Sequence, residues 1–386
     1  FSLWLIPVFF FQFVVAQNRT LVWSELFSST PTLQNVHSHA QQFELEIILD
    51  VYDKVKDSLQ RFHYDPSHNK YFYPASIVKL PSAIFACERI NQLNNSVDIH
   101  TPLRINANGP CQRECKSDAF NKEGLPTIAG FIRKALTISD NSSFSRLYEW
   151  VGPEYYVHRF QELNMPKSVI RKKFDSCSLE DCRCVNSIDF IKNDSVVYHE
   201  PSRCYHGPYF QPMDQMTIGL RHMEGKKIIS SPKDFSQNNC LPLENLHELL
   251  IGVCYPQFSK FTLHLTKEQR TWIMESMRKS PAELHQKWKE DSKFHQHYYN
   301  FMFYGNKPEG HQEEIKITNI VGLAYGYTIE SAVIEDQNGN FIVLSAKLYT
   351  NKNDIAGSGE YRYESISMPF MRDLGKVCLQ WMQNTR

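Results

Sequence analysis

The chain has 386 residues and 42% of them are hydrophobic, so it can bury a large core. Its 42 Lys and Arg residues balance 42 Asp and Glu residues, and the formal net charge is zero. Proteins that bind nucleic acid or an anionic membrane surface normally carry a basic excess. The composition therefore argues against both kinds of partner.

Residues 1–16 carry no charge and are followed by a polar run over 17–20. This stretch is too short for a membrane span, which needs roughly 20 apolar residues. Val14 and Ala16 are small residues of the kind that a signal peptidase recognises. We therefore predict a secretory signal peptide over 1–16 whose first residues precede this sequence, with a buried N-terminal helix as the alternative. The remainder, 17–386, is predicted to be a single domain that is exported to the periplasm or secreted.

Apolar periodicity predicts the elements along the chain. The first half is expected to contain a helix over 22–41, a strand over 43–51, a polar turn over 58–69, a helix that opens at Ser76, helices over 126–163 and an irregular segment over 165–210. The second half is expected to contain a helix over 212–223, loops over 225–262, a helix over 265–278 with a Thr266/Gln269 capping box, strands over 314–321, 325–335 and 341–349, and a helix over 361–382. Asn338-Gly339 predicts a hairpin turn between the last two strands.

This order predicts an α/β protein of the α+β type. Strands from the two ends of the chain would form one antiparallel sheet flanked by helices. A helical insertion over about 76–223 would form an all-α subdomain.

Ten cysteines permit disulfides in an exported protein. The predicted bridge sites are two clusters, Cys111 with Cys115, and Cys177 with Cys182, Cys184 and Cys204. Cys87 lies in an apolar helical run and is predicted to be a buried thiol.

Two patterns invite a metal interpretation. Cys182-Arg183-Cys184 matches no common zinc spacing. His285, His295 and His297 lie in a polar stretch that fits a surface insertion. We therefore predict neither a metal site nor a cofactor.

Ser76-Ile77-Val78-Lys79 is an S-x-x-K motif at the start of an apolar helix. Positions i and i+3 share one face of a helix, so the hydroxyl would lie beside the amine. The first amides of a helix lack internal partners and can stabilise a developing oxyanion. Three other matches, at Ser67/Lys70, Ser230/Lys233 and Ser276/Lys279, do not begin an apolar helix. Ser76 is therefore the candidate nucleophile.

Ser139-Asp140-Asn141 is a second motif, and it precedes a helix. By itself it would be interpreted as a helix N-cap, a position that all three residue types favour. Together with Ser76 and Lys79, however, it resembles the motifs of class A β-lactamases and penicillin-binding proteins. The resemblance extends over roughly residues 22–384 and is closest to divergent β-lactamase-like serine hydrolases of bacteria.

The resemblance implies a role for each of these residues. Ser76 would attack a lactam or ester carbonyl, and Lys79 would accept or shuttle its proton. Ser139 would pass a proton to the leaving nitrogen, and Asn141 would bind the substrate's side-chain amide.

The family's third motif is found only in part. Ile320 stands where the family has Lys or Arg to attract the substrate carboxylate. Lys316 on the same strand would lie roughly 13 Å away, too far to replace it. Gly322 and Leu323 follow, and the resemblance implies that both contact the substrate. The amide of Leu323 would join that of Ser76 in an oxyanion hole.

Class A enzymes also use a loop glutamate to activate the water for deacylation. Of Glu180, Asp181 and Glu200, only Glu200 precedes a proline, although it falls late in the segment 165–205. Glu200 is therefore the candidate base. Without a base, acylation would be followed by slow deacylation.

Three functions remain open. The favoured one is β-lactam hydrolysis through a Ser76 acyl-enzyme, the activity that confers antibiotic resistance. The second is acyl transfer or hydrolysis on a cell-wall peptide or another amide or ester, as in penicillin-binding proteins. The third is a non-catalytic binding protein on the same fold. We expect a monomer whose partner is a β-lactam or a peptide-like amide.

Overall fold

A computed structural model of the chain describes residues 20–67, 70–93, 97–121, 123–284, 288, 294–308 and 310–384. The predicted signal peptide over 1–16 and His285 lie outside these residues. Within the described ranges, no helix combines the length and the hydrophobicity that crossing a membrane requires.

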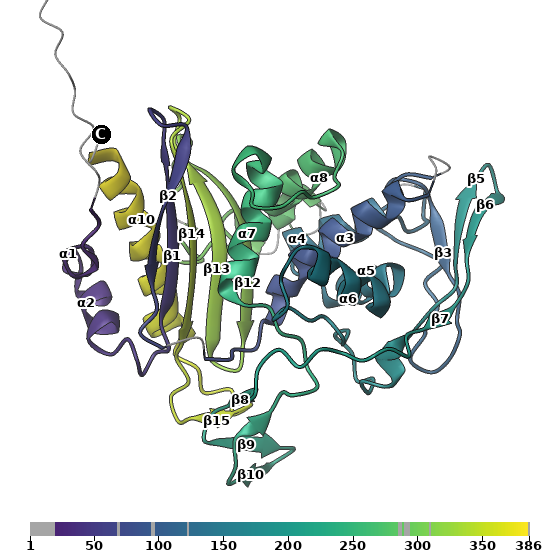
Figure 1. Cartoon of the computed structure of the whole chain (residues 1–386), viewed down its shortest axis with the longest axis horizontal. Helices are drawn as coiled ribbons and strands as arrows, with labels where there is room; N and C mark the ends of the chain where they lie inside the picture. The colour runs from purple at the N-terminus through teal and green to yellow at the C-terminus, as the bar shows by residue number, and fades with distance from the viewer. Residues whose placement is uncertain are drawn as a thin grey trace, which may run out of the picture.

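A five-stranded sheet forms the centre of the molecule (Figure 1). Its strands are β1 (Glu46–Asp53), β2 (Ser58–Tyr64), β12 (Lys316–Ala324), β13 (Tyr327–Glu335) and β14 (Phe341–Tyr349). Their order is β12-β13-β14-β1-β2, and every neighbouring pair is antiparallel. The pairing of β1 with β14 confirms that the two ends of the chain build one sheet.

The prediction of a polar turn over 58–69 was wrong, because the first part of this segment forms β2. This strand lies at the edge of the sheet, and its residues are half-buried or exposed. An edge strand tolerates polar side chains that would be too costly in the sheet interior. The sequence therefore lacked the apolar signal of a strand.

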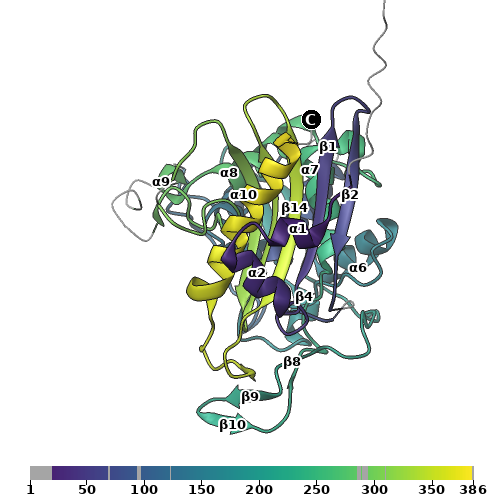
Figure 2. The same cartoon turned by 90° about the vertical axis from the view of Figure 1, so that its left-hand side faces the viewer.

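Alternate residues of the central strands enter two separate hydrophobic cores, as the two-residue period of a strand requires. On β13, Ile329 and Val333 face one core, whereas Ala332 and Ile334 face the other. The second core is covered by α1 (Trp23–Phe27), α2 (Pro31–Ser38) and α10 (Met368–Asn384), which Figure 2 shows in front of the sheet. The helix predicted over 22–41 is thus two helices, and Thr30 caps the second of them.

The helical subdomain packs on the first core. It contains α3 (Lys79–Asn91), α4 (Ile128–Thr137), α5 (Asn141–Val151) and α6 (Pro153–Glu162), with α7 (Leu243–Cys254), α8 (Lys267–Arg278) and the short α9 (Pro281–Leu284) beside it. The capping box of Thr266 and Gln269 at the start of α8 is confirmed.

Short strands lie in the segments predicted as irregular over 165–210, helical over 212–223 and loops over 225–262, and two more lie where no element was predicted. They are β3 (Leu103–Ile105), β4 (Cys184–Val185), β5 (Ile188–Lys192), β6 (Ser195–Glu200), β7 (Arg203–Cys204), β8 (Thr217–Ile218), β9 (Arg221–Glu224), β10 (Lys227–Ile229), β11 (Lys233–Asp234) and β15 (Ile355–Ala356). The helix predicted over 212–223 was wrong, because Gly219 has a φ of 71° there and β9 pairs with β15. A Cβ at Gly219 would lie 2.8 Å from the carbonyl oxygen of Asp354.

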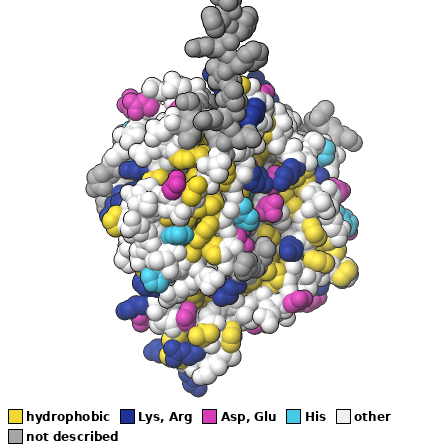
Figure 3. All heavy atoms as spheres, turned by 60° about the vertical axis from the view of Figure 1, so that its left-hand side comes forward, with side chains coloured by type: hydrophobic (Ala, Val, Ile, Leu, Met, Phe, Trp, Pro, Cys, Tyr) yellow, Lys and Arg dark blue, Asp and Glu magenta, His cyan; other side chains and the backbone are white. Residues whose placement is uncertain are grey.

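Two disulfides fix the loops of the helical subdomain. Cys111–Cys177 joins the two predicted cysteine clusters, and Cys184–Cys204 lies within the second. Cys87 is a buried free thiol, as predicted. The face in Figure 3 shows acidic, basic and His side chains interspersed among hydrophobic ones, in keeping with the balanced composition.

Candidate active site

Ser76 lies on a tight turn between the sheet and the helical subdomain. A 3₁₀ turn over Ala75–Val78 precedes α3. Ser76 lies in this turn, and the α-helix that was predicted to open at Ser76 begins three residues later, at Lys79. Ala75 has a φ of 48°, a conformation that is uncommon for a residue other than glycine. The i, i+3 spacing brings Lys79 Nζ to 2.9 Å from Ser76 Oγ.

Lys79 gathers the predicted motif residues around one buried amine. Its Nζ lies 2.9 Å from Ser139 Oγ, 2.8 Å from Asn141 Oδ1 and 2.5 Å from the carbonyl oxygen of Ser139. The structure therefore brings Ser76, Lys79, Ser139 and Asn141 together.

Two of the oxygens around Lys79 Nζ can only accept hydrogen bonds, so each of them receives one N–H of the amine. These are the Ser139 carbonyl and, as the amide is oriented here, Asn141 Oδ1. The third position of the nitrogen faces the hydroxyls of Ser76 and Ser139. In a neutral amine this position is a lone pair, which can accept a proton from a serine.

Burial lowers the pKa of Lys79 from 10.5 to about 7, against an opposing attraction from Asp140. The side chain is fully buried, and none of its hydrogen bonds in the described structure reaches a carboxylate. A substantial fraction of the amine is therefore neutral at physiological pH, as a general base requires.

The Ser139–Asn141 turn is both a helix N-cap and part of the group of residues around Lys79. Asp140 is the N-cap of α5, and its carboxylate accepts a hydrogen bond of 2.6 Å from the amide of Ser143. Ser139 has a φ of 55°. This backbone conformation and the capping role of Asp140 leave the side chains of Ser139 and Asn141 facing Lys79.

Gly322 allows strand β12 to approach the turn that carries Ser76. A Cβ at this position would lie 2.7 Å from the carbonyl oxygen of Pro74, which is closer than real Cβ atoms come. The next residue, Leu323, is partly exposed and lines the same cleft as Ser76. Ile320 is buried beside a small cavity that Ser139 also lines, so the strand supplies no charge there.

The cleft in front of Ser76 has a volume of about 500 Å³. Asn141 and Leu323 line it, and so do residues that the sequence analysis missed, namely Tyr73, Lys172, Lys173, Phe174, Asp175, Asn238, Asn239 and Tyr325. Asp175 is the one carboxylate among the described residues that line the cleft. It lies in the segment where a loop carboxylate was sought, but no Pro follows it, so the pattern did not single it out.

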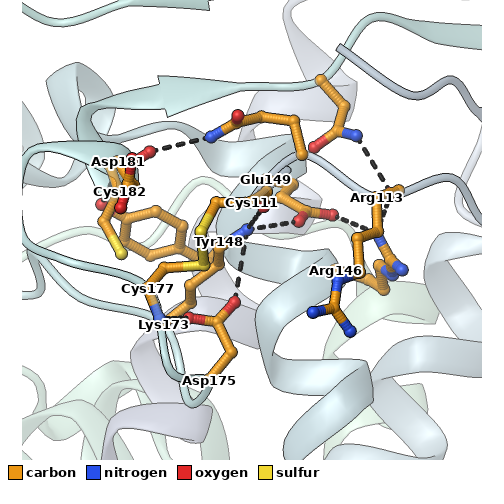
Figure 4. Close-up of polar contacts among 12 residues, drawn as sticks. Cys111, Arg113, Arg146, Tyr148, Glu149, Lys173, Asp175, Cys177, Asp181 and Cys182 are labelled. Atoms are coloured by element: carbon orange, nitrogen blue, oxygen red, sulfur yellow. Dashed lines mark hydrogen bonds and ion pairs between the residues drawn. A yellow bond between two sulfur atoms is a disulfide. The ribbon is translucent and has the colours of Figure 1, made fainter. Parts of the chain in front are cut away.

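Lys173 holds the segment that carries Asp175 (Figure 4). Its buried ammonium lies 2.9 Å from Glu149 Oε1 and 3.4 Å from Asp175 Oδ2, and it donates to the carbonyl oxygen of Cys111. The Cys111–Cys177 disulfide ties the same segment down two residues after Asp175. The ion pair and the disulfide together fix this wall of the cleft.

Glu200, predicted as the candidate base, is not part of this cluster. Its carboxylate pairs with Arg89 at 2.5 Å and with Arg203 at 2.6 Å, and it accepts a hydrogen bond from Tyr198. Arg89 is ten residues beyond Lys79 on α3, about 15 Å along the helix axis. The structure therefore does not bring Glu200 into the cluster around Ser76, because two arginines hold its carboxylate at the far end of the helix.

The sequence matches a known family. A family model described as the beta-lactamase enzyme family matches residues 34–236, just over half of the chain. The chain belongs to the beta-lactamase enzyme family. A comparison with curated protein sequences finds no match.

Solved beta-lactamase structures share the fold of this family member. The enzyme from Desulfarculus baarsii matches with a TM-score of 0.52 at 13% identity over 94% of this chain and 99% of its own. The enzyme from Burkholderia vietnamiensis gives 0.52 at 11% identity, covering 95% and 99%. The enzyme from Sphaerobacter thermophilus gives 0.51 at 12% identity, covering 94% and 98%. At these identities the likeness shows the antiparallel α/β fold alone.

Proposed function

We propose that this family member is a serine hydrolase that opens β-lactams through an acyl-enzyme at Ser76. The observation that carries the proposal is the contact of 2.9 Å between Ser76 Oγ and the amine of Lys79, whose pKa lies near 7. A hydroxyl is a poor nucleophile until a base takes its proton. A neutral amine at hydrogen-bond distance can do so at physiological pH.

Acylation would proceed as follows. Ser76 Oγ attacks the lactam carbonyl, and its proton passes to Lys79. The C–N bond then breaks, and the ring nitrogen receives a proton from Ser139, which Lys79 contacts at 2.9 Å and can resupply. The amides of Ser76 and Leu323 would hold the oxyanion, and Asn141 would hold the substrate's amide. In related sites one such oxyanion donor is worth about 10²–10³ in rate.

We assign deacylation to Asp175 in place of Glu200. Asp175 lines the cleft with Ser76, and its carboxylate is held by Lys173 and by the amide of Cys177 at 3.0 Å. A carboxylate in this place can accept a proton from the water that attacks the acyl ester.

Lys172 gives the cleft a positive charge, which Ile320 cannot provide. Lys172 lines the cleft and is half-buried, and within the described ranges it has no ion-pair partner. Lys173 next to it is compensated by Glu149 and Asp175. Lys172 would therefore attract a negatively charged group of the substrate.

The proposal includes export to the periplasm or the exterior, because the two disulfides form most readily in an oxidising compartment. It also includes action as a monomer on a small β-lactam without a cofactor.

The test is incubation with a penicillin and with a chromogenic cephalosporin, followed by intact mass over time. We expect turnover that Ser76→Ala abolishes and Ser230→Ala leaves unchanged, since Ser230 is the exposed serine of another S-x-x-K match. A stable adduct at Ser76 without turnover would favour the penicillin-binding alternative. Complete inertness of the folded protein toward β-lactams and activated esters would overturn the proposal in favour of a binding protein.

A further inference from the structure

Three potential metal ligands meet on the strand pair β1–β2, away from the serine chemistry. Glu46 lies on β1, and His63 and Asp65 lie on or next to β2. Residues two apart on a strand point to the same face, so His63 and Asp65 share one. The pairing of Ile47 with Tyr64 places Glu46 opposite Asp65. One donor atom from each residue lies within 4.8 Å of the others.

We propose that Glu46, His63 and Asp65 bind a zinc ion. One imidazole with two carboxylates suits zinc, whereas calcium and magnesium prefer ligand sets made of oxygen alone. Ligand atoms about 2.0–2.2 Å from a tetrahedral zinc lie roughly 3.3 Å apart. His63 Nε2 and Glu46 Oε1 are 3.7 Å apart, close to this spacing, and Asp65 offers a donor atom within the 4.8 Å that the three ligand atoms span.

Neighbouring groups orient both carboxylates. Lys347, fully buried, approaches Glu46 Oε2 to 3.6 Å, while Oε1 is the oxygen that faces His63. Ser67 donates to Asp65 Oδ1 from its amide at 3.1 Å and from its hydroxyl at 2.8 Å. Such outer contacts hold the ligands of a metal site in place. Because Lys347 offsets one of the two negative charges, we expect micromolar rather than tighter affinity.

The site is accessible from solvent. His63 is about half exposed, which gives the ion an entry path. Glu46 and His63 also line a cavity of about 260 Å³ with Lys70, Tyr71 and other residues. A zinc ion with three protein ligands keeps a fourth position for water or an anionic ligand, and this cavity has room for one.

This proposal goes beyond the hydrolase function and beyond the sequence analysis, which predicted no metal site. Sequence spacing did not suggest the site, because Glu46 is joined to the other two ligands only by strand pairing and because β2 was predicted as a turn.

The test is a titration of the full chain with zinc by calorimetry. We expect one equivalent to bind at micromolar concentration, and His63→Ala and Asp65→Asn each to weaken binding at least about 10-fold, because loss of an outer-shell partner alone typically costs about 10–100-fold. His100→Ala is the matched control, an accessible histidine in a turn elsewhere in the chain that also faces a glutamate, and it should bind as the wild type does. Glu46 is left intact, because its removal would leave Lys347 buried without its carboxylate partner.

Cobalt provides an independent readout. Co²⁺ at this site should give visible absorption bands of low coordination number, which His63→Ala removes. Equal zinc affinity in His63→Ala and the wild type, or no binding by the wild type at micromolar zinc, would overturn the proposal. Neither result depends on hydrolysis, so the zinc site and the hydrolase function can fail separately.

Discussion

Lys79 and Lys173 are both buried beside the same cleft, yet their surroundings differ. Within the described residues, the hydrogen bonds of Lys79 all go to neutral oxygens, from two serines and an asparagine. Lys173 lies between two carboxylates, those of Glu149 and Asp175. Burial without a counterion favours the neutral amine, and it lowers the pKa of Lys79 to about 7.

The two lysines therefore differ in role, one chemical and one structural. A buried lysine that lies between carboxylates connects the elements that supply them. A buried amine without such a partner can exchange a proton at physiological pH. We therefore assign Lys79 to catalysis and Lys173 to holding the wall that carries Asp175.

The largest effect is expected from Lys79→Met, which removes the proposed base and keeps the side-chain volume. The rate of acylation by a penicillin should fall about 10²–10⁴-fold, the usual contribution of a positioned base. Rapid mixing with mass detection measures this rate. Acylation of the variant at the wild-type rate would show that Lys79 does not activate Ser76.

The next largest effect concerns deacylation. Asp175→Asn removes the proposed base for water and should slow deacylation by about 10²-fold or more, so that the adduct accumulates. Glu200→Gln is the matched control, since it also neutralises a carboxylate but at the far end of α3. The decay of the adduct by mass spectrometry measures both. An adduct that decays slowly in Glu200→Gln and rapidly in Asp175→Asn would show that Glu200, not Asp175, is the base for deacylation.

Lys173→Met should act mainly on stability. Removing one partner of a buried ion pair typically costs about 3–5 kcal/mol, and we expect the lower end because Arg146 still contacts Glu149 at 2.8 Å. Urea denaturation measures the free energy of unfolding. The double variant Glu149→Gln/Lys173→Met should recover part of this loss, because it also removes the buried carboxylate that Lys173→Met leaves without its lysine, while Arg146 loses its ion pair. If Lys173→Met costs no more than Lys79→Met, the contrast between the two lysines is wrong.

The smallest effect is the dependence of acylation on pH. The proposed base is the neutral amine, so the rate should fall as Lys79 takes up a proton, about tenfold per pH unit below a pKa near 7. The same shift affects stability. Between about pH 7 and 10.5 only the unfolded chain binds this proton, so stability should rise with pH there. A pH–rate profile without a break near 7 would contradict the shifted pKa.

Much of the site could be predicted because its signals are local. The spacing of Ser76 and Lys79 is a property of one helical turn, and Ser139 to Asn141 is a capping pattern. Strands β12, β13 and β14 alternate or run apolar over their whole length, so their existence was visible in the sequence.

The parts that failed depend on partners far away in the chain. Glu200 precedes a proline, as a pattern search would want, but only the folded chain places Arg89 and Arg203 against it. Asp175 has no local sequence signature. It becomes a candidate base because two distant contacts hold its segment at the cleft: the ion pair of Lys173 with Glu149 and the Cys111–Cys177 disulfide.

The sequence alone determined which groups could react and the class of fold that would carry them, because backbone periodicity and helix spacing are encoded in neighbouring residues. Only the tertiary structure decided which of those groups lie in one cleft and which are neutralised elsewhere. The physical reason is that burial and the distance to an opposite charge set a side chain's proton affinity, and both arise when segments far apart in the chain pack together.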